Sequence, residues 1–279
     1  MSEESQITSP ERRGPRVLVV ANQKGGVGKT TTAINLGTAL AAVGEQALVI
    51  DLDPQGNAST GLGIARSDRR LSAYDVPVGH GALGEGDGGT RIPGLFILPA
   101  TVDLSGAELE LYTERDRNYR LRTALEQFAA TGTKISYVLI DCPPALSLLT
   151  VNAMAAAHAV VVPLQCEFFA LEGLSMLLKT IERVRSGLNP TLEIQGIILT
   201  MFDKRNNLSD QVASDVRAHL GDKVYQTVIP RNVRISEAPS HGLPALVYDI
   251  RCPGSQAYIR LASELIQRER ARFAETMAA

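Results

Sequence analysis

The sequence lacks the features that mark several protein classes. Its three cysteines are far apart and form no C-x-x-C pair, which argues against a zinc site or a disulfide scaffold and suits a reducing cytoplasm. No apolar run approaches the roughly 20 residues that a membrane span requires. The net charge is only −2, so any nucleic-acid binding must come from a local basic patch. Residues 1–15 are polar without the apolar core of a signal peptide, and they predict a disordered tail.

What is present predicts a large α/β domain over residues 16–273. Apolar residues make up 44% of the chain, and at least seven apolar strand candidates alternate with helices without a repeat or a break in composition. This order favours a single doubly wound, mainly parallel sheet flanked by helices. Residues 79–89 are rich in glycine and predict a surface loop. The predicted strands are 17–20, 47–50, 95–98, 137–140, 159–163, 194–201 and 224–229. The longer predicted helices are 118–130, 211–220, 255–273 and one that runs to about residue 187 with its core face from Leu174.

Residues 17–32, VLVVANQKGGVGKTTT, combine a buried strand, a glycine-rich loop and the start of a helix. Glycines let consecutive backbone N–H groups approach phosphates, and the helix N-terminus adds further donors. Lys29 would reach the β- and γ-phosphates, and the Thr30 hydroxyl would bind Mg²⁺. The expected nucleotide-binding residues of this loop are Lys24, Gly25, Gly26, Val27, Gly28, Lys29, Thr30 and Thr31.

Carboxylates follow two further predicted strands. Asp51 and Asp53 end the second apolar run, and two residues apart on a strand they point to the same side. Taken alone, these two carboxylates would indicate an acidic turn at the end of a strand. Together with a phosphate loop, they favour a switch segment near the γ-phosphate. Asp141 ends the strand at 137–140, where open α/β sheets bind ligands, and would hold a water of Mg²⁺.

The loop departs from the common phosphate-loop pattern in an informative way. Gln23 stands where that pattern has glycine, and the added Lys24 gives K-G-G-x-G-K-T. This variant resembles the ParA/MinD group, which includes the nitrogenase iron protein. Further blocks, in order DLDPQGNAS, LIDCPP, QCEFFALEG and TVIPRNVRISEAPSHG, extend the resemblance over about residues 16–266. The chain is similar to the ParA/Soj chromosome-partitioning ATPases.

The resemblance implies an ATP-hydrolysing enzyme with ATP and Mg²⁺ as cofactors, in which two subunits face each other across two ATP molecules. Lys24 would cross to the partner's nucleotide, like an arginine finger. Asp53 would orient the attacking water, so that Lys24, Lys29 and Asp53 form the catalytic set. The metal residues would be Thr30, Asp51 and Asp141, and the residues near adenine and ribose would be Pro230 and Asn232.

The resemblance also implies partners and a place in the cell. The ATP-bound homodimer would bind double-stranded DNA without sequence preference, and a ParB-type centromere-binding protein would stimulate hydrolysis and release. The protein would be cytoplasmic and nucleoid-associated. Arg205 and Arg234 match DNA-contacting positions of the family. From the residues alone each would be a solvated arginine, because residues 203–251 hold seven Lys/Arg and six Asp/Glu.

Three alternative functions are open at this point. A MinD-like membrane ATPase needs a C-terminal amphipathic helix, but Tyr258, Leu261, Leu265 and Ile266 form a stripe that a folded core would bury, and beyond it only Phe273 is bulky. We therefore expect no membrane partner. An iron–sulfur carrier lacks its paired cysteines. An ATP-dependent ligase of the dethiobiotin-synthetase type should hold a small-substrate pocket, for which the sequence has no motif.

Overall fold

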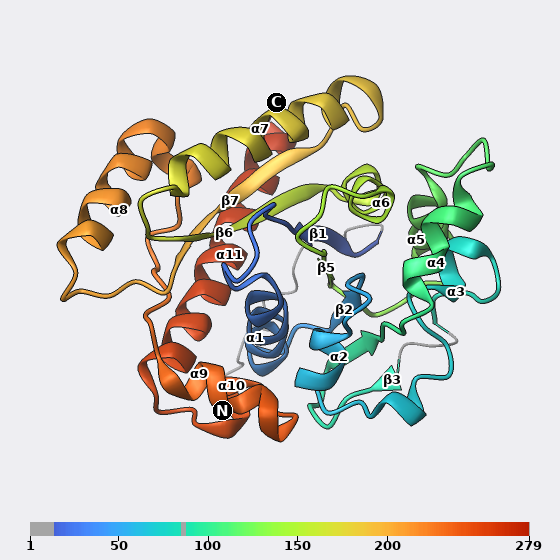
Figure 1. Ribbon diagram of the computed structural model, residues 1–279, viewed down its shortest axis with the longest axis horizontal. Coiled ribbons are helices and arrows are strands. Elements are labelled where there is room, and N and C mark those ends of the chain that lie inside the picture. Colours follow the sequence, from blue (N-terminus) through green and yellow to red (C-terminus); the bar gives the residue numbers. More distant parts are fainter. Residues whose placement is uncertain (1–13, 85–87, 279) are drawn as a thin grey trace, which may run out of the picture.

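The computed structural model describes residues 14–84 and 88–278. Residues 1–13 of the expected tail lie outside the described residues, as do positions 85–87 of the expected loop. The described chain folds around one twisted sheet with helices on both faces (Figure 1).

Seven strands form the sheet in the order β3-β4-β2-β5-β1-β6-β7. All pairs are parallel except β3 with β4, which confirms the doubly wound, mainly parallel sheet. The carboxyl ends of β1, β2 and β5 therefore meet at one edge. The strands are β1 (Arg16–Val20), β2 (Ala47–Asp51), β3 (Gly88–Gly89), β4 (Leu95–Leu98), β5 (Tyr137–Asp141), β6 (Ala159–Gln165) and β7 (Glu193–Thr200).

Alternate strand residues bury against opposite layers of helices, because side chains alternate across a sheet. Leu18 and Val20 pack into one core, and Val17 and Val19 pack into the other. The first core is covered by α1 (Lys29–Ala42), α2 (Asn57–Gly61), α9 (Val233–Glu237), α10 (Ala245–Tyr248) and α11 (Pro253–Ala278). The second is covered by α3 (Asp75–Val78), α4 (Leu104–Leu111), α5 (Arg120–Ala130), α6 (Leu148–Ala156), α7 (Ala170–Gly187) and α8 (Asn207–Leu220).

The last helix is docked on the sheet, as its apolar stripe predicts. Tyr258, Leu261 and Leu265 are fully buried, and the Tyr258 hydroxyl lies 3.3 Å from that of Thr32 on α1. These residues are therefore unavailable as a membrane anchor. Among the described residues, no helix has the length and apolar character needed to span a bilayer.

The predicted strand at 224–229 is wrong. Among the described residues, one isolated bridge, between Val224 and Ile197, joins this segment to β7. Two backbone hydrogen bonds accompany it, from Tyr225 N–H to Ile197 O and from Ile229 N–H to Leu199 O. Between them, the N–H groups of Gln226 and Thr227 donate instead to the Glu264 carboxylate on α11, at 2.8 and 2.9 Å. A tertiary contact with a distant helix thus takes the donors that a strand would need.

Other helices and strands differ from the predicted ones for local reasons. The predicted helix at 211–220 starts earlier, at Asn207, because the Asn206 side chain caps it by accepting from Leu208 N–H. Within the expected glycine-rich loop, Gly88–Gly89 forms the short antiparallel edge strand β3. The short helices α2, α3, α9 and α10 were not predicted, since four or five residues are too few for a periodic pattern.

Candidate nucleotide-binding site

The loop between β1 and α1 has the backbone shape that a phosphate cradle needs. Gly26 and Gly28 adopt left-handed conformations, with φ of 75° and 90°, which favour glycine. A Cβ added at Gly25 or Gly26 would meet nothing within 4 Å, so the space before the loop is open. No side chain caps the N-terminus of α1, whose first N–H groups therefore remain available to an anion.

Side chains from neighbouring strands hold this loop in place. The Asn22 amide donates to a β6 carbonyl at 2.7 Å, and its oxygen accepts from Lys24 N–H at 3.0 Å. The Thr200 hydroxyl, at the end of β7, donates to the Val27 carbonyl at 2.9 Å. These contacts tie the cradle to the carboxyl ends of β6 and β7.

Lys29 lies inside the cradle with 7% of its surface exposed. Its ammonium donates to the Lys24 carbonyl at 2.9 Å, so it spans the loop. Burial lowers the pKa of Lys29, while Asp141, Cys142 and Asp53 act in the opposite direction. A partly desolvated cation beside an open space is suited to an anionic ligand.

Asp51 and Asp141 are buried side by side on β2 and β5, but their surroundings differ. Asp51 accepts hydrogen bonds from Ser59 N–H and Oγ, at 2.8 and 2.7 Å. Both oxygens of Asp141 are buried and have no hydrogen bond of good geometry among the described residues, although the Thr30 hydroxyl lies close enough to act against the rise in the pKa of Asp141. Burial raises the pKa of Asp51 to about 6, and burial and the Asp51 charge raise the pKa of Asp141 well above its ordinary value.

The unpartnered Asp141 carboxylate fits a cation. A buried carboxylate without a partner is costly, and a cation held near Asp141 and Thr30 would compensate it. Over residues 14–84 and 88–278, no group of three His, Cys, Asp or Glu side chains could hold a metal alone. This agrees with Mg²⁺, which is usually held by one or two carboxylates together with waters and substrate phosphates.

The segment after β2 is fixed by contacts that sequence reasoning missed. The Ser59 side chain of α2 donates a hydrogen bond to Asp51. Ser59 lies in the block DLDPQGNAS, but no role was predicted for it. Arg69 is buried and donates to the Ala100 carbonyl at 2.9 Å and to the Thr60 hydroxyl at 2.9 Å. Arg69 lies in a weakly patterned stretch, so the sequence held no signal for it. Asp53 is half-buried, and its side chain accepts from Gln55 N–H at 3.0 Å.

The Lys24 ammonium forms an ion pair with Glu167, just after β6. Glu167 lies in the matching block QCEFFALEG, but no role was predicted for it. Pro230 lies beside Phe202, just past the carboxyl end of β7 and hence at the same sheet edge as the cradle. The Asn232 side chain caps α9 by accepting from Arg234 N–H at 2.9 Å.

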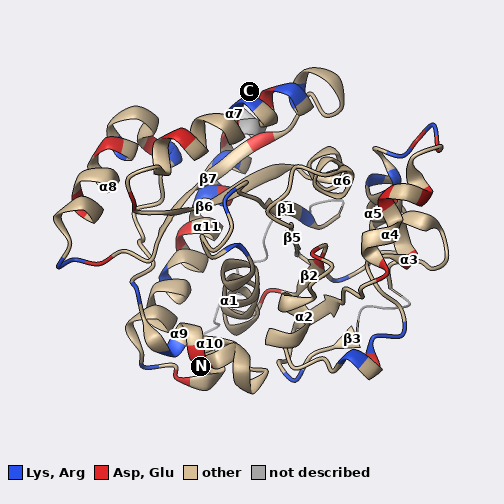
Figure 2. Ribbon diagram, viewed as in Figure 1, with Lys and Arg blue, Asp and Glu red and all other residues tan. Residues whose placement is uncertain are grey.

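Arg205 and Arg234 are both paired within their own chain. Arg205, 88% exposed, donates to both oxygens of Asp203, at 3.0 and 2.9 Å. Arg234 donates to Glu237 at 3.0 Å. The charged loop before α8 and the α9 segment lie on the same side of the molecule (Figure 2). A hollow of about 460 Å³ is lined by cations from three segments: Lys204, Arg205, Arg231 and Arg260. Arg231 and Arg260 were not predicted as site residues.

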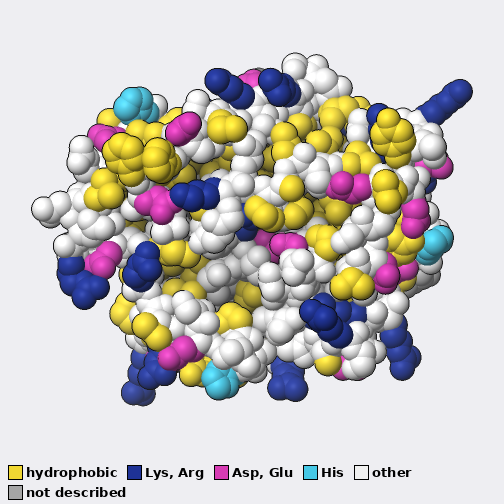
Figure 3. Space-filling model, in the orientation of Figure 1, with side chains coloured by type: hydrophobic (Ala, Val, Ile, Leu, Met, Phe, Trp, Pro, Cys, Tyr) yellow, Lys and Arg dark blue, Asp and Glu magenta, His cyan; other side chains and the backbone are white. Residues whose placement is uncertain are grey.

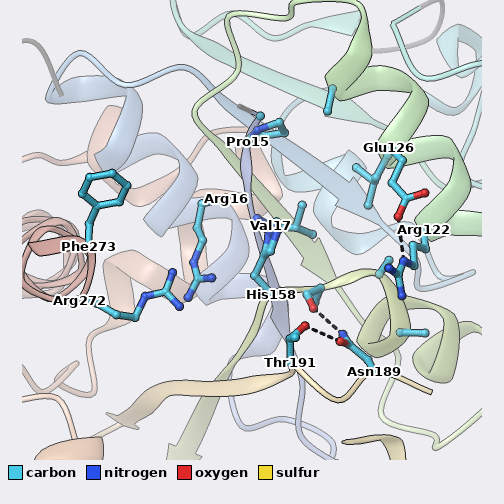
Figure 4. Close-up of a pocket in the computed structure, with 16 residues that line it drawn as sticks. Pro15, Arg16, Val17, Arg122, Glu126, His158, Asn189, Thr191, Arg272 and Phe273 are labelled. Atoms are coloured by element: carbon cyan, nitrogen blue, oxygen red, sulfur yellow. Dashed lines mark hydrogen bonds and ion pairs between the residues drawn. The ribbon is translucent and has the colours of Figure 1, made fainter. Parts of the chain in front are cut away.

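A pocket of about 500 Å³ lies at the opposite edge of the sheet, beside the amino ends of β1 and β6 (Figure 4). Its arginines are paired: Arg16 with Glu269 at 3.1 Å, and Arg122 with Glu126 at 2.9 Å. His158 accepts from Val17 N–H through Nδ1 at 2.9 Å. This pocket is remote from the phosphate loop and holds none of the predicted site residues.

The site defines a P-loop nucleoside-triphosphatase fold. It consists of a strand, a glycine cradle and a helix, with a buried lysine in the cradle and an aspartate on the adjacent strand. The family described as "AAA domain" matches residues 15–194. The chain is 66% identical over 260 residues to the chromosome partitioning protein ParA of Caulobacter vibrioides, covering 93% of this chain and 97% of that protein. It is 49% identical over 250 residues to the sporulation initiation inhibitor protein Soj of Bacillus subtilis, covering 90% and 98%. The chain belongs to the ParA/Soj family of chromosome-partitioning ATPases.

Solved structures agree on the fold. Cobyrinic acid a,c-diamide synthase from Mycobacterium smegmatis, with bound ATP analogue and magnesium, matches with a TM-score of 0.79 and 36% identity, covering 92% of this chain and 96% of that chain. The cell division ATPase MinD of Pyrococcus furiosus matches with a TM-score of 0.74 and 26% identity, covering 90% and 98%. The first is named as a biosynthetic enzyme, but its identity is well below that of the partitioning relatives.

Proposed function

We propose that this protein is an Mg²⁺-dependent ATPase that dimerises on ATP, binds DNA without sequence preference and releases it when a ParB-type partner stimulates hydrolysis. The observation that carries the proposal is the open phosphate cradle with Lys29 inside it and the unpartnered Asp141 beside it. Relatives named as partitioning ATPases at 66% and 49% identity support the biological role.

Within the cradle, backbone N–H groups from Gly25 to Thr31 hold the phosphates, and Lys29 neutralises the β- and γ-oxygens. Thr30 and Asp141 would hold Mg²⁺, with Asp51 on the neighbouring strand as a supporting carboxylate. The metal supplies charge stabilisation at the transferring phosphoryl group. Asp53 sits at the same edge, where its carboxylate orients the attacking water and accepts its proton.

Lys24 completes the site of a facing subunit. To do so it leaves Glu167 and reaches the partner's phosphates, where it stabilises the charge that develops in the transition state. Apolar side chains next to this position support a face that a second subunit covers: Phe168 and Phe169 are 75% and 61% exposed. Hydrophobic side chains also gather on this side of the molecule over α6 and α7 (Figure 3). Dimerisation would bury them.

The DNA surface comprises Arg205, Arg234 and the cations around the 460 Å³ hollow. Two subunits double this surface, which gives a physical reason for ATP-dependent binding. Its contacts go to phosphates and are therefore insensitive to sequence and sensitive to salt. Because Arg205 and Arg234 already have carboxylate partners, each phosphate contact replaces an existing ion pair. Attachment to DNA would place the protein on the nucleoid.

The decisive experiment measures binding of the full chain to random-sequence duplex DNA with ATP, with ADP and without nucleotide, alongside its oligomeric state. We expect binding only with ATP and Mg²⁺, together with a dimer. Equal binding in all three states would contradict the ATP-gated cycle. A monomer that hydrolyses ATP only when a small carboxylic acid and an amide donor are added would favour the biosynthetic activity of the diamide synthase relative.

A further inference from the structure

The outer face of α4 exposes a row of large apolar side chains. Val102, just before the helix, Leu109 on it and Tyr112 after it are 66%, 81% and 70% exposed. Their spacing of seven and three residues places them along one side of a helix. The opposite side, Leu104, Ala107 and Leu111, is buried in the core. A helix that contacts only the core would carry polar residues on its outer side. Tyr112 contacts the Arg117 guanidinium, which lies 5.3 Å from the centre of its ring, whereas burial gives Val102 and Leu109 no role in the described fold.

Acidic residues border this row. Residues 102–112 contain Asp103, Glu108 and Glu110 and no lysine or arginine. Glu110 is fixed there by the Tyr74 hydroxyl, which lies 2.9 Å from both of its carboxylate oxygens. The α4 face therefore combines an exposed apolar stripe with a mainly acidic rim, which also includes Arg117, whose guanidinium lies 5.3 Å from the centre of the Tyr112 ring. It lies beside α3 and α5, at the side of the molecule away from α8 and α9 (Figure 1).

The α4 face is connected to the candidate nucleotide-binding site by two short links. Ala100, shortly before α4, donates its N–H to the Ser59 hydroxyl at 3.0 Å, and Ser59 holds Asp51. Glu108 accepts from the N–H of Leu149 on α6, at 3.4 Å, and α6 follows the loop after Asp141. A ligand on α4 would thus touch a helix that contacts α6 through Glu108 and that follows shortly after Ala100, which contacts Ser59.

We propose that the α4 face is a docking surface for a basic amphipathic segment of a partner protein. The apolar row buries the partner's apolar side, and the carboxylates pair with its lysines or arginines. The acidic side chains of the α4 face favour a basic partner segment over two other possible occupants, a second copy of the chain and a lipid surface. A second copy of the chain would bring two negative rims together, and an anionic lipid surface would be repelled by them. This inference goes beyond the proposed function and does not require it.

The test is a fluorescence anisotropy titration of the full chain with a dye-labelled synthetic helix of about 14 leucines and lysines, segregated on two faces. A second peptide carries glutamate in place of lysine. The variants Leu109→Ser and Tyr112→Ser remove exposed apolar groups without touching the core. Val247→Ser, 51% exposed on α10, is the matched control. Thermal unfolding of each variant verifies that it is folded.

We expect saturable binding of the lysine peptide, weakened about tenfold or more by Leu109→Ser or Tyr112→Ser and unchanged by Val247→Ser. Glu110→Gln should weaken binding less, and added salt should weaken it further. Equal binding of the glutamate peptide, equal binding by all variants or no saturable binding would overturn the proposal. So would a Leu109→Ser variant whose main defect is self-association or attachment to phosphatidylserine vesicles. Peptide binding is read without ATP, so a failure of the proposed ATPase cycle would leave this result intact.

Discussion

The phosphate loop and the basic surface differ in how their charged side chains are buried and paired. Lys29 and Asp141 are buried and act on each other electrostatically, but Asp141 has no hydrogen bond of good geometry in its own chain among the described residues. Arg205 and Arg234 are exposed, and each is paired with a carboxylate of its own chain. A buried charge without a partner is costly and indicates a missing ligand, whereas an exposed ion pair contributes little and indicates nothing alone. The geometry of the ATP site therefore supports its function directly, whereas the proposed DNA surface is supported chiefly by the family.

The largest expected effect is on hydrolysis. Asp53→Ala should slow ATP turnover about 10²–10⁴-fold, because a water-orienting base acts in the transition state, while ATP binding is largely retained. The variant should accumulate as an ATP-bound dimer on gel filtration. A variant that stays monomeric under conditions in which the parent dimerises would contradict the assignment of Asp53.

Lys29→Ala should weaken ATP affinity about 10²–10³-fold, because it removes a buried cation from the phosphates. Isothermal titration with ATP and Mg²⁺ measures it, and Thr30→Ala should lose the Mg²⁺ dependence. Lys24→Ala is the matched control: the same side chain is removed at the edge of the same loop, so ATP binding should survive while dimerisation or stimulated hydrolysis is lost. Normal ATP affinity in Lys29→Ala would remove this loop as the site.

Asp141→Asn should separate stability from function. Neutralising an unpartnered buried carboxylate should stabilise the nucleotide-free protein by about 1–2 kcal/mol at neutral pH, as seen when proteins lose strained active-site charges. The same change should abolish the further stabilisation that ATP gives in the presence of Mg²⁺. Thermal melts with and without ligand measure both. Asp51→Asn serves as the comparison and should destabilise the protein, since Asp51 accepts two hydrogen bonds from Ser59.

The basic surface should respond to salt. Arg205→Ala and Arg231→Ala should each lower the slope of log affinity for duplex DNA against log salt by about 1, with ATP-driven dimerisation intact. Adding Arg234→Ala should lower it further. Arg122→Ala, which breaks an ion pair at the remote pocket, is the matched control and should leave the slope unchanged. An unchanged slope in the triple variant would exclude this surface from DNA binding.

The smallest effect concerns the ion pair of Lys24 with Glu167. Both side chains are partly exposed, so breaking the pair is worth at most about 1 kcal/mol. Glu167→Gln frees Lys24 without removing it and should lower the ATP concentration needed for dimerisation by up to about fivefold. Sedimentation across an ATP titration measures the shift. A higher ATP requirement would mean that Glu167 positions Lys24 for the partner.

Short segments of sequence were enough to predict the phosphate loop and its strand edge. The glycines, Lys29 and Thr30 stand within a few residues, and both Asp51 and Asp141 end apolar runs that predict parallel strands; the structure shows that these two strands are neighbours. The missed residues act over long separations. Arg69 reaches Ala100, Glu167 reaches Lys24, and neither pairing leaves a local pattern.

The sequence by itself determined the parallel sheet, the cradle at the end of β1 and the burial of the α11 stripe, because each follows from side-chain periodicity and backbone freedom within one segment. Only the tertiary structure decided that Asp141 lacks a partner while Asp51 has one, that Glu264 takes the donors of the expected strand at 224–229, and that α4 turns apolar residues outward. The physical reason is the same in each case. Hydrogen-bond satisfaction and burial depend on which distant groups fold against a residue, and spacing along the chain does not specify them.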